Sequence, residues 1–284
     1  MTIVPQVCKA AASDILGRFR EIVSDPLNLL IERHPLAGVV EDGWVTLHNG
    51  NKAPIEGEFS YYNKFSDILA INRGVHEPLE EFVFQAVLKV LPSKPTMLEL
   101  GSYWAHYSMW LARQRPSAKI IMVEPETTNI NAGKLNFQAN GFQGEFLQAF
   151  VGNGHFVVDD FFDKAELSKI EILHADIQGY EIEMLHGAKN SLSSTKIDYV
   201  FVSTHSQQLH VDTVRTLTDH NYRIEAESDF DNCTTSYDGL VFASSPNVSA
   251  IFSGGLQIAN RQRINEMSVN ERIDFIRALL AQTF

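Results

Sequence analysis

Two apolar segments that flank one helix-length segment constrain the fold of this chain more than any other feature. Residues 97–101 read Met-Leu-Glu-Leu-Gly, residues 120–125 read Ile-Ile-Met-Val-Glu-Pro, and residues 105–114 between them can form a helix. A strand, a small-residue turn, a helix and a second strand that ends in a carboxylate form one half of a nucleotide-binding βαβ fold. In such a half, backbone N–H groups at the helix N-terminus point into the turn, and the acid can accept hydrogen bonds from ribose hydroxyls.

The composition is that of an ordinary globular protein and argues against several classes of function. The 284 residues are 44% hydrophobic and 20% charged, which is compatible with one large domain plus an extension or with two small domains. The formal net charge of −12 argues against a general nucleic-acid binder, which needs a basic face. No segment approaches the roughly 18 apolar residues of a membrane span. We therefore expect neither a nucleic-acid partner nor a membrane-spanning segment.

The N-terminus and the cysteines indicate the compartment. Residues 1–5 lack a basic segment followed by an apolar stretch, so they do not resemble a signal peptide. Cys8 and Cys233 lie far apart, and neither has the spacing of a metal or redox motif, which argues against a disulfide framework. These features predict a cytoplasmic protein.

Residues 1–73 are predicted to form an N-terminal helical and hairpin cap. Residues 6–33 carry apolar side chains at helical spacing, and residues 39–47 read as a β-hairpin with Asp42-Gly43 as its two-residue turn. A turn-rich stretch then marks the end of the cap. The cap could close over a substrate site or form an interface between copies of the chain, so a homo-oligomer is one alternative.

Strands and helices alternate over residues 74–246, which are predicted to form one domain. The expected strands are 97–101, 119–124, 144–151, 170–175, 197–204, 222–228 and 238–244, and the expected helices are 105–114, 127–140, 159–168, 180–192 and 207–220. This alternation predicts an α/β fold with a doubly wound, mostly parallel seven-stranded sheet. Because only a loop joins the last two strands, we expect an antiparallel edge strand. Residues 247–284 then form a linker and a helix around 268–282.

The glycine pattern distinguishes between the ligands that such a sheet binds. A dinucleotide fingerprint needs G-x-G-x-x-G after the first strand. Here the turn has the single glycine Gly101, and Tyr103 and Trp104 leave little room for a pyrophosphate. Glu99 would repel phosphates but suits a cationic ligand, and S-adenosylmethionine has an ammonium, a sulfonium and a ribose but no phosphate. The residues favour a methyltransferase over the alternatives, an NAD(P)-dependent oxidoreductase or a non-catalytic nucleotide-binding protein.

Four segments resemble a known family. Residues 99–108 resemble the first motif of class I methyltransferases, and residues 123–125 resemble the second. Residues 172–188, an Asp followed by x-x-Gly-x-Glu and a Leu-x-Gly-Ala helix, are similar to the fourth-strand segment of the FkbM family. The Glu-Pro in residues 74–78 resembles the one that precedes the first strand in that family. The sequence departs from the family at Ala105, where glycine is usual.

The resemblance implies a Rossmann-like class I methyltransferase fold with S-adenosylmethionine as cofactor. FkbM-like enzymes are O-methyltransferases that act on hydroxyls of sugars, polyketides, other natural products or glycans, which implies a small-molecule or glycan acceptor. The implied cofactor-binding residues are Glu77, Glu99, Gly101, Ser102 and Glu124. Tyr103 could pack against the adenosine or belong to the core.

Two polar residues end successive strands that we expect to be neighbours in the sheet. Asp176 follows strand 170–175, and His205 follows strand 197–204, so both can face one acceptor hydroxyl. His205 could act as a general base, with Asp176 orienting it or binding substrate. Alternatively, Asp176, His205 and a further carboxylate such as Glu181 could hold a divalent cation, for which mixed ligands favour Mn²⁺, Fe²⁺ or Zn²⁺. We prefer the metal-free interpretation, because two residues do not define a metal site.

Overall fold

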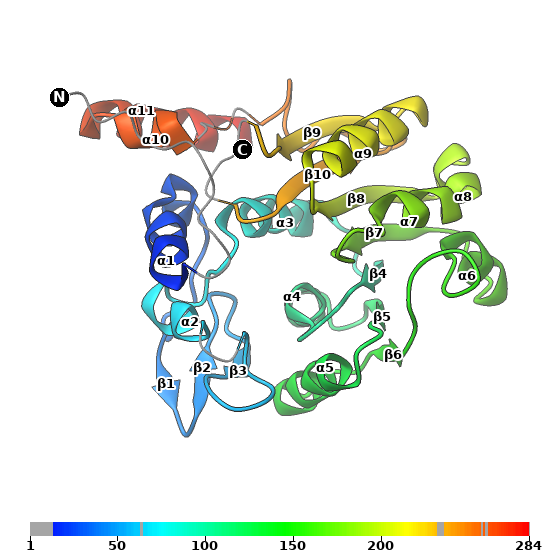
Figure 1. The fold of residues 1–284 in the computed structure, drawn as a ribbon, viewed down its shortest axis with the longest axis horizontal. Helices are drawn as coiled ribbons and strands as arrows, with labels where there is room; N and C mark the ends of the chain where they lie inside the picture. The colour runs from blue at the N-terminus through cyan, green and yellow to red at the C-terminus, as the bar shows by residue number, and fades with distance from the viewer. Residues whose placement is uncertain (1–13, 63–64, 232–235, 257, 259–260, 284) are drawn as a thin grey trace.

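The computed structural model describes residues 14–62, 65–231, 236–256, 258 and 261–283. Within these residues, helices cover both faces of a seven-stranded sheet, and an N-terminal segment with a small sheet of its own lies beside it (Figure 1). In the same part of the chain, no helix combines the length and the apolar composition that crossing a membrane requires.

The large sheet confirms the predicted α/β architecture. Its strands are β4 (Thr96–Leu100), β5 (Lys119–Val123), β6 (Glu145–Leu147), β7 (Ile170–Ala175), β8 (Ile197–Thr204), β9 (Arg223–Ser228) and β10 (Gly239–Ser244). Their order is β6-β5-β4-β7-β8-β10-β9, and β4 to β8 run parallel. The chain proceeds from β4 outward through β5 to β6 and then crosses back to β7, which lies on the other side of β4. The switch point where this fold binds ligands therefore lies between β4 and β7.

The last two strands pair antiparallel at one edge of the sheet, as predicted. The strand that runs against the others is β10, the inner member of the pair, and β9 forms the edge. The sequences explain this arrangement. All six residues of β10 are buried, whereas charged and uncharged residues alternate along β9. Burial in the interior of the sheet stabilises an apolar strand more than a strand in which every second residue is charged.

Alternating strand residues build a separate apolar layer on each face. Met97, Met122 and Ile172 pack on the face covered by α3 (Pro78–Val90), α4 (His106–Gln114) and α5 (Thr127–Asn140). Leu98, Val123 and Leu173 pack on the face covered by α6 (Val158–Lys164), α7 (Glu181–Gly187), α8 (Lys189–Ser193) and α9 (Gln207–Asp219). This two-residue period is the one a strand buried on both faces requires.

The N-terminal segment lies against the α3–α4 face. It comprises α1 (Ile15–Ser24), the short helix η1 (Pro26–Leu29), β1 (Val40–Glu41), β2 (Trp44–Thr46), β3 (Lys52–Pro54) and α2 (Asp67–Ile71). Asp42 and Gly43 form the predicted hairpin turn, with φ values of 51° and 79° that suit a type I′ turn. Leu47 and Ile68 belong to the same apolar cluster as residues of α3 and α4, so the segment shares their core.

The structure corrects several predicted elements. The strand expected over 144–151 covers only β6, because the chain turns away after Leu147 towards the ligand-binding edge. The helix expected over 180–192 is divided into α7 and α8, with Ala188 between them. Strand β3 lies in the stretch interpreted as turns, and α10 (Arg261–Glu266) precedes the expected terminal helix α11 (Val269–Thr283). Prediction and structure coincide for α5, β7 and β8.

Candidate active site

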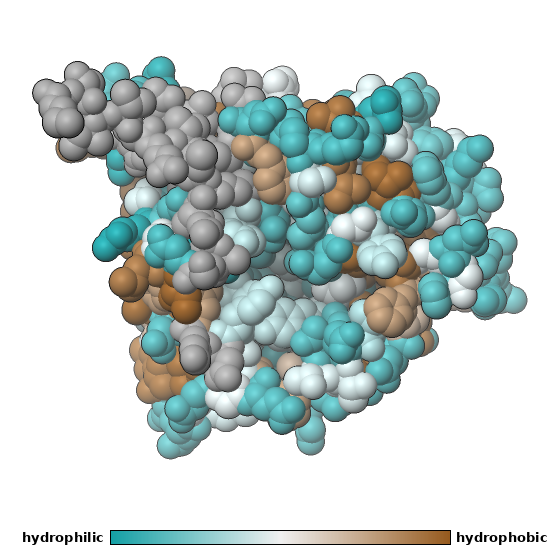
Figure 2. Space-filling view, viewed as in Figure 1, coloured by the Kyte–Doolittle hydropathy of each residue, from teal (hydrophilic) through white to brown (hydrophobic). Residues whose placement is uncertain are grey.

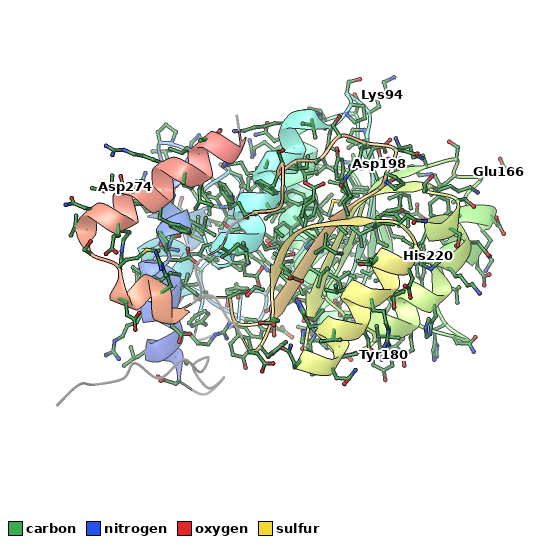
Figure 3. All side chains as sticks on the ribbon, turned by 90° about the horizontal axis from the view of Figure 1, so that it is seen from above. Lys94, Glu166, Tyr180, Asp198, His220 and Asp274 are labelled. Atoms are coloured by element: carbon green, nitrogen blue, oxygen red, sulfur yellow. The ribbon has the colours of Figure 1, made fainter. Side chains whose placement is uncertain are left out.

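A cavity of about 510 Å³ lies at the carboxyl ends of β4, β5 and β7. Figure 3 shows the two ends of the sheet: Lys94, Glu166 and Asp198 precede or begin strands at one end, and Tyr180, which follows β7, lies at the other. The residues of the cavity wall that concern the site most are Tyr62, Gly101, Tyr103, Glu124, Asn129 and Asp176. Its volume is in the range of small-molecule and cofactor sites.

Gly101 is required where the turn after β4 crosses the loop after β7. Its φ is 74°, and a Cβ atom there would lie 1.8 Å from the backbone oxygen of Asp176. Backbone N–H groups of Gly101 and Ser102 donate to Val123 O, which holds the turn against the end of β5. The glycine thus allows both loops to form one wall of the cavity.

Ala105 ends the same turn in a left-handed conformation, with φ 64° and ψ 40°. Glycine adopts this conformation without strain, which explains the usual glycine of the family at this position. Alanine is accommodated here, and α4 begins at the next residue.

Glu124 is held rigidly at the tip of β5. Its Oε2 accepts from Tyr103 N at 3.0 Å, and its Oε1 accepts from Glu126 N at 2.9 Å and from Asn129 Nδ2 at 3.2 Å. The side chain lines the cavity, although its residue is 4% exposed. The carboxylate is fixed where this fold binds ribose hydroxyls.

The N-terminal segment supplies part of the cavity wall. Tyr62 N donates to Tyr103 Oη at 3.0 Å, and the two rings lie 5.6 Å apart in an edge-on arrangement. Both side chains line the cavity. Trp104, in contrast, is buried and stacks on His106, so it belongs mainly to the core.

A smaller cleft of about 70 Å³ adjoins the cavity and shares Gly101, Tyr103 and Asp176 with it. Glu77 and Glu99 line this cleft, and burial raises the pKa of each carboxyl to about 7. Tyr107 Oη donates to Glu77 Oε2 at 2.9 Å, and Ser108 Oγ donates to Glu99 Oε2. Carboxyls that are costly to ionise without a partner suit a cationic ligand.

Ser102 and His174 complete the cleft. Ser102 Oγ is buried and has no hydrogen-bond partner among the described residues. Burial disfavours the charge on His174, but the hydrogen bond from its Nε2 to Glu80 Oε1, 2.6 Å long, outweighs burial and raises the pKa to about 9. The cleft therefore combines acidic and basic groups with one unsatisfied hydroxyl.

Asp176 and His205 meet at the carboxyl ends of β7 and β8. His205 Nε2 lies 3.2 Å from Asp176 Oδ1, and His205 Nδ1 lies 2.6 Å from Glu181 Oε1. The Glu181 side chain is fully buried, whereas Asp176 is 34% exposed. Glu181 therefore fixes the His205 ring on its buried side, and Asp176 lies on the side of the ring that faces the cavity.

The two carboxylates determine the charge of His205. Burial lowers its pKa, but the hydrogen bonds with Asp176 and Glu181 outweigh burial and raise it to about 10. Gln178 Nε2 donates to Asp176 Oδ1 at 2.9 Å and lies 2.7 Å from His205 Nε2, which cannot accept a hydrogen bond from it once the ring is protonated. At neutral pH the raised pKa favours an imidazolium that donates from both nitrogens.

A family model described as a methyltransferase FkbM domain matches residues 54–224. The chain belongs to the FkbM methyltransferase family. It is therefore an S-adenosylmethionine-dependent methyltransferase.

Solved structures of low identity resemble this FkbM methyltransferase over much of its length. A precorrin-6y methyltransferase from Geobacter metallireducens is 14% identical with a TM-score of 0.43, and the match covers 57% of this chain and 86% of the other. TrmK from M. capricolum, in complex with S-adenosylhomocysteine, is 16% identical with a TM-score of 0.42, over 72% and 98% of the two chains. No curated protein matches.

The FkbM methyltransferase brings seven of its nine sequence-predicted site residues to two adjoining spaces, whereas His205 and Glu181 line neither of them. Gly101, Tyr103, Glu124 and Asp176 line the larger cavity, and Glu77, Glu99 and Ser102 line the cleft. Sequence reasoning missed Asn129, Tyr107 and His174. Of these, Asn129 had a usable signal, because it lies in the first turn of the helix that follows Glu124.

Proposed function

We propose that this protein transfers a methyl group to a hydroxyl of a sugar, a glycan or another natural-product small molecule. The observation that carries the proposal is a partly exposed carboxylate, Asp176, held at the edge of the cofactor cavity by a histidine that Glu181 fixes. A hydroxyl must lose its proton when its oxygen is methylated, and we assign Asp176 to receive that proton.

The residues around the cavity fit S-adenosylmethionine. Glu124 can accept hydrogen bonds from the ribose, and the unsatisfied Ser102 Oγ can bond the cofactor. Glu77 is more open to the cleft than Glu99, so we assign the ammonium chiefly to Glu77, with Glu99 behind it. When bound, the cofactor supplies an activated methyl group for in-line displacement.

Asp176 is the proton acceptor in this proposal. His205 Nε2 and Gln178 Nε2 both approach its Oδ1, which leaves Oδ2 to accept a hydrogen bond from the acceptor hydroxyl. The hydroxyl proton passes to Oδ2 as the oxygen is methylated. Because Asp176 is partly exposed, that proton can then leave to water.

His205 acts as the group that positions Asp176. With a pKa raised to about 10, the ring already carries its proton at neutral pH and has no lone pair with which to act as a base. Its Nε2 lies 3.2 Å from Asp176 Oδ1 and fixes that oxygen at the edge of the cavity. The pH dependence of turnover distinguishes this role from that of a general base.

A divalent cation is not part of the proposed reaction. Asp176 and Glu181 approach different nitrogens of the His205 ring, so one ion cannot bind all three residues unless the ring moves. Glu181 is better suited to orienting the histidine than to binding a metal.

Aromatic side chains near Asp176 suit a polyhydroxylated acceptor. Tyr62 and Tyr237 line the cleft, and the Arg18 guanidinium lies 4.0 Å from the centre of the Tyr237 ring. Rings can pack against the C–H faces of a sugar while Asp176 and Asp238 accept hydrogen bonds from its hydroxyls. Because Arg18 and Tyr62 belong to the N-terminal segment, we propose that this segment covers the bound acceptor.

We also propose that the N-terminal segment forms the interface of a homo-oligomer. Figure 2 shows apolar residues gathered over β1 and α2. The side chains concerned are Leu36, Val39, Val40 and Ile71, which are 47–62% exposed. Sedimentation analysis of the wild type and of Ile71→Lys tests this interface, and a monomeric wild type contradicts it.

Calorimetry and product analysis test the proposed function. We expect the protein to bind S-adenosylmethionine but not NAD⁺, and to release S-adenosylhomocysteine when a hydroxylated acceptor is added. A panel of free sugars, alkyl glycosides and phenols identifies the acceptor class. A methyl ether survives mild base whereas a methyl ester does not, so base treatment of the product separates hydroxyl from carboxyl transfer. Products methylated only at nitrogen, carbon or carboxyl contradict the proposal.

A further inference from the structure

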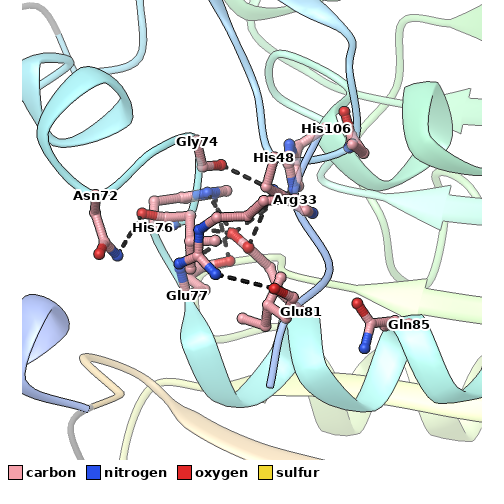
Figure 4. A network of polar contacts seen from close by, with 12 residues as sticks. Arg33, His48, Asn72, Gly74, His76, Glu77, Glu81, Gln85 and His106 are labelled. Carbon is pink, nitrogen blue, oxygen red and sulfur yellow. Dashed lines mark hydrogen bonds and ion pairs between the residues drawn. The ribbon is translucent and has the colours of Figure 1, made fainter. Parts of the chain in front are cut away.

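A buried cluster of histidines and one carboxylate joins the N-terminal segment to the methyltransferase sheet. His48 follows β2, Glu81 lies in α3, and His106 is the first residue of α4 (Figure 4). Their exposed fractions are 1%, 0% and 2%. None of the three is part of the Asp176–His205 pair, and the proposed reaction does not require them.

The distances within this cluster suit a metal ion. His48 Nδ1 lies 3.4 Å from Glu81 Oε2, and His106 Nε2 lies 3.7 Å from Glu81 Oε1. One potential ligand atom from each of the three residues lies within 4.8 Å of the others. Ligands about 2.1 Å from a tetrahedral ion lie about 3.4 Å apart, so ligand atoms within 4.8 Å of one another must move inward to bind one ion.

Several atoms of the cluster are buried without a hydrogen-bond partner among the described residues. They are His48 Nε2, Glu81 Oε2 and both ring nitrogens of His106. Buried polar atoms are normally satisfied, and such a concentration at one point calls for a missing partner. A cation bound between the three residues would satisfy the carboxylate oxygen and one nitrogen of each ring.

Neighbouring groups orient the ligands. His48 Nδ1 lies 2.9 Å from Gly74 O, and its other nitrogen has no partner among the described residues, so one nitrogen can keep this bond while the other coordinates. His76 Nδ1 lies 2.7 Å from Glu81 Oε1, and His76 N donates to the same oxygen at 2.9 Å. These contacts fix Oε1 and leave Oε2 directed at the cluster.

We propose that His48, Glu81 and His106 bind a divalent transition-metal ion of the zinc class, which fastens the N-terminal segment to α3 and α4. Two nitrogens and one carboxylate oxygen suit Zn²⁺ or Co²⁺ better than Mg²⁺ or Ca²⁺. The ion links three elements distant in sequence, and His106 also lines the cleft beside Glu77. Its binding therefore stabilises the wall of the cofactor cleft without entering the reaction.

Metal binding by the wild-type protein provides the first test. After dialysis against a chelator, we expect added Zn²⁺ to raise the thermal unfolding temperature, because an ion that binds only the folded state stabilises it. Added Co²⁺ is expected to give the intense visible absorption of a four-coordinate site. Absence of the temperature shift, or only the weak absorption of six-coordinate aqueous Co²⁺, overturns the proposal.

Variants locate the ion. His48→Gln and His106→Gln should abolish the Zn²⁺-dependent temperature shift, whereas His186→Gln, an exposed histidine on α7, should keep it. Asp176→Asn should also keep it, because the proposed ion is separate from the reacting residues. Retention of the shift in the first two variants, or its loss in Asp176→Asn, contradicts this assignment. If the first two variants fail to fold, the Co²⁺ spectrum of the wild type decides.

Discussion

His205 Nε2 lies 3.2 Å from Asp176 Oδ1 across the carboxyl ends of two neighbouring parallel strands. The pairing is part of a longer arrangement, because Glu181 binds the opposite nitrogen of the same ring at 2.6 Å. From the core to the cavity, the order in space is therefore the buried carboxylate of Glu181, the imidazole of His205 and the partly exposed carboxylate of Asp176. This order assigns orientation to Glu181 and His205 and the proton transfer to Asp176.

Turnover should depend on a protonated His205. Its pKa of about 10 predicts that kcat is constant across neutral pH and falls above pH 10 as the ring loses its proton. A general base would show the opposite trend, with kcat rising until the ring is neutral. The pH profile of kcat with saturating cofactor measures this difference, and a rise between pH 8 and 10 contradicts the positioning role.

The same histidine should make stability depend on pH. Because folding raises its pKa from 6.5 to about 10, its contribution is complete below pH 6.5 and is lost as the pH rises towards 10. Urea unfolding at pH 6.5 and pH 10 should therefore show a smaller loss of stability in His205→Ala than in the wild type. Equal losses in the two proteins would contradict the raised pKa.

Asp176→Asn should separate binding from turnover. We expect cofactor affinity to stay within a few-fold of the wild type, while kcat falls by about 10²–10⁴, the usual contribution of a proton-transfer group. Asp163→Asn, an exposed acid on α6, is the matched control and should leave both constants unchanged. Calorimetry and S-adenosylhomocysteine release measure the two quantities. An Asp176→Asn enzyme with normal kcat contradicts the assignment.

Cofactor affinity should rise with pH. Burial raises the pKa of Glu77 and of Glu99 to about 7, so each must lose a proton before it can pair with the ammonium of the cofactor. Between pH 6 and 7.5 the ionised fraction of such a group rises several-fold, and affinity should follow. Calorimetry should show a weaker pH dependence in Glu77→Gln. If the pH dependence of cofactor affinity in Glu77→Gln equals that of the wild type, a residue other than Glu77 binds the ammonium.

Ala105→Gly should stabilise the protein. Alanine holds a left-handed conformation at this position, and releasing that strain should be worth about 1 kcal/mol. The control is Ala86→Gly within α3, where the same exchange should cost about 1 kcal/mol because glycine weakens a helix interior. Urea unfolding measures both changes. Destabilisation by Ala105→Gly would show that the alanine methyl group contributes more in packing than the backbone strain costs.

The sequence predicted those parts of the site that depend on strand order. Asp176 and His205 end successive strands of a doubly wound sheet, so their meeting follows from topology alone. Glu124 was predicted in the same way, since it ends the second strand of the βαβ half. The short β6 was not predicted, because the turn after Leu147 depends on the cavity that the following residues line.

The buried polar network could not be predicted from local patterns. Glu80 and Glu81 are acidic residues in the first turn of α3, yet both are buried because the N-terminal segment and β7 cover them. Their partners are far away in sequence: His174 lies 94 residues from Glu80, and His48 comes from the loop after β2. The spacing of apolar residues along a helix does not show whether its polar face is buried, because distant segments of the chain cover that face only when the protein folds.

Transfer of a deuterated methyl group tests the central claim most directly. The protein is incubated with S-adenosylmethionine that carries a trideuterated methyl group and with a hydroxylated acceptor, and the product is analysed by mass spectrometry and NMR. We predict a trideuteromethyl ether on oxygen with the wild type and with Asp163→Asn, and almost none with Asp176→Asn. Label on nitrogen, carbon or a carboxyl group, or equal ether formation by Asp176→Asn, would contradict the account.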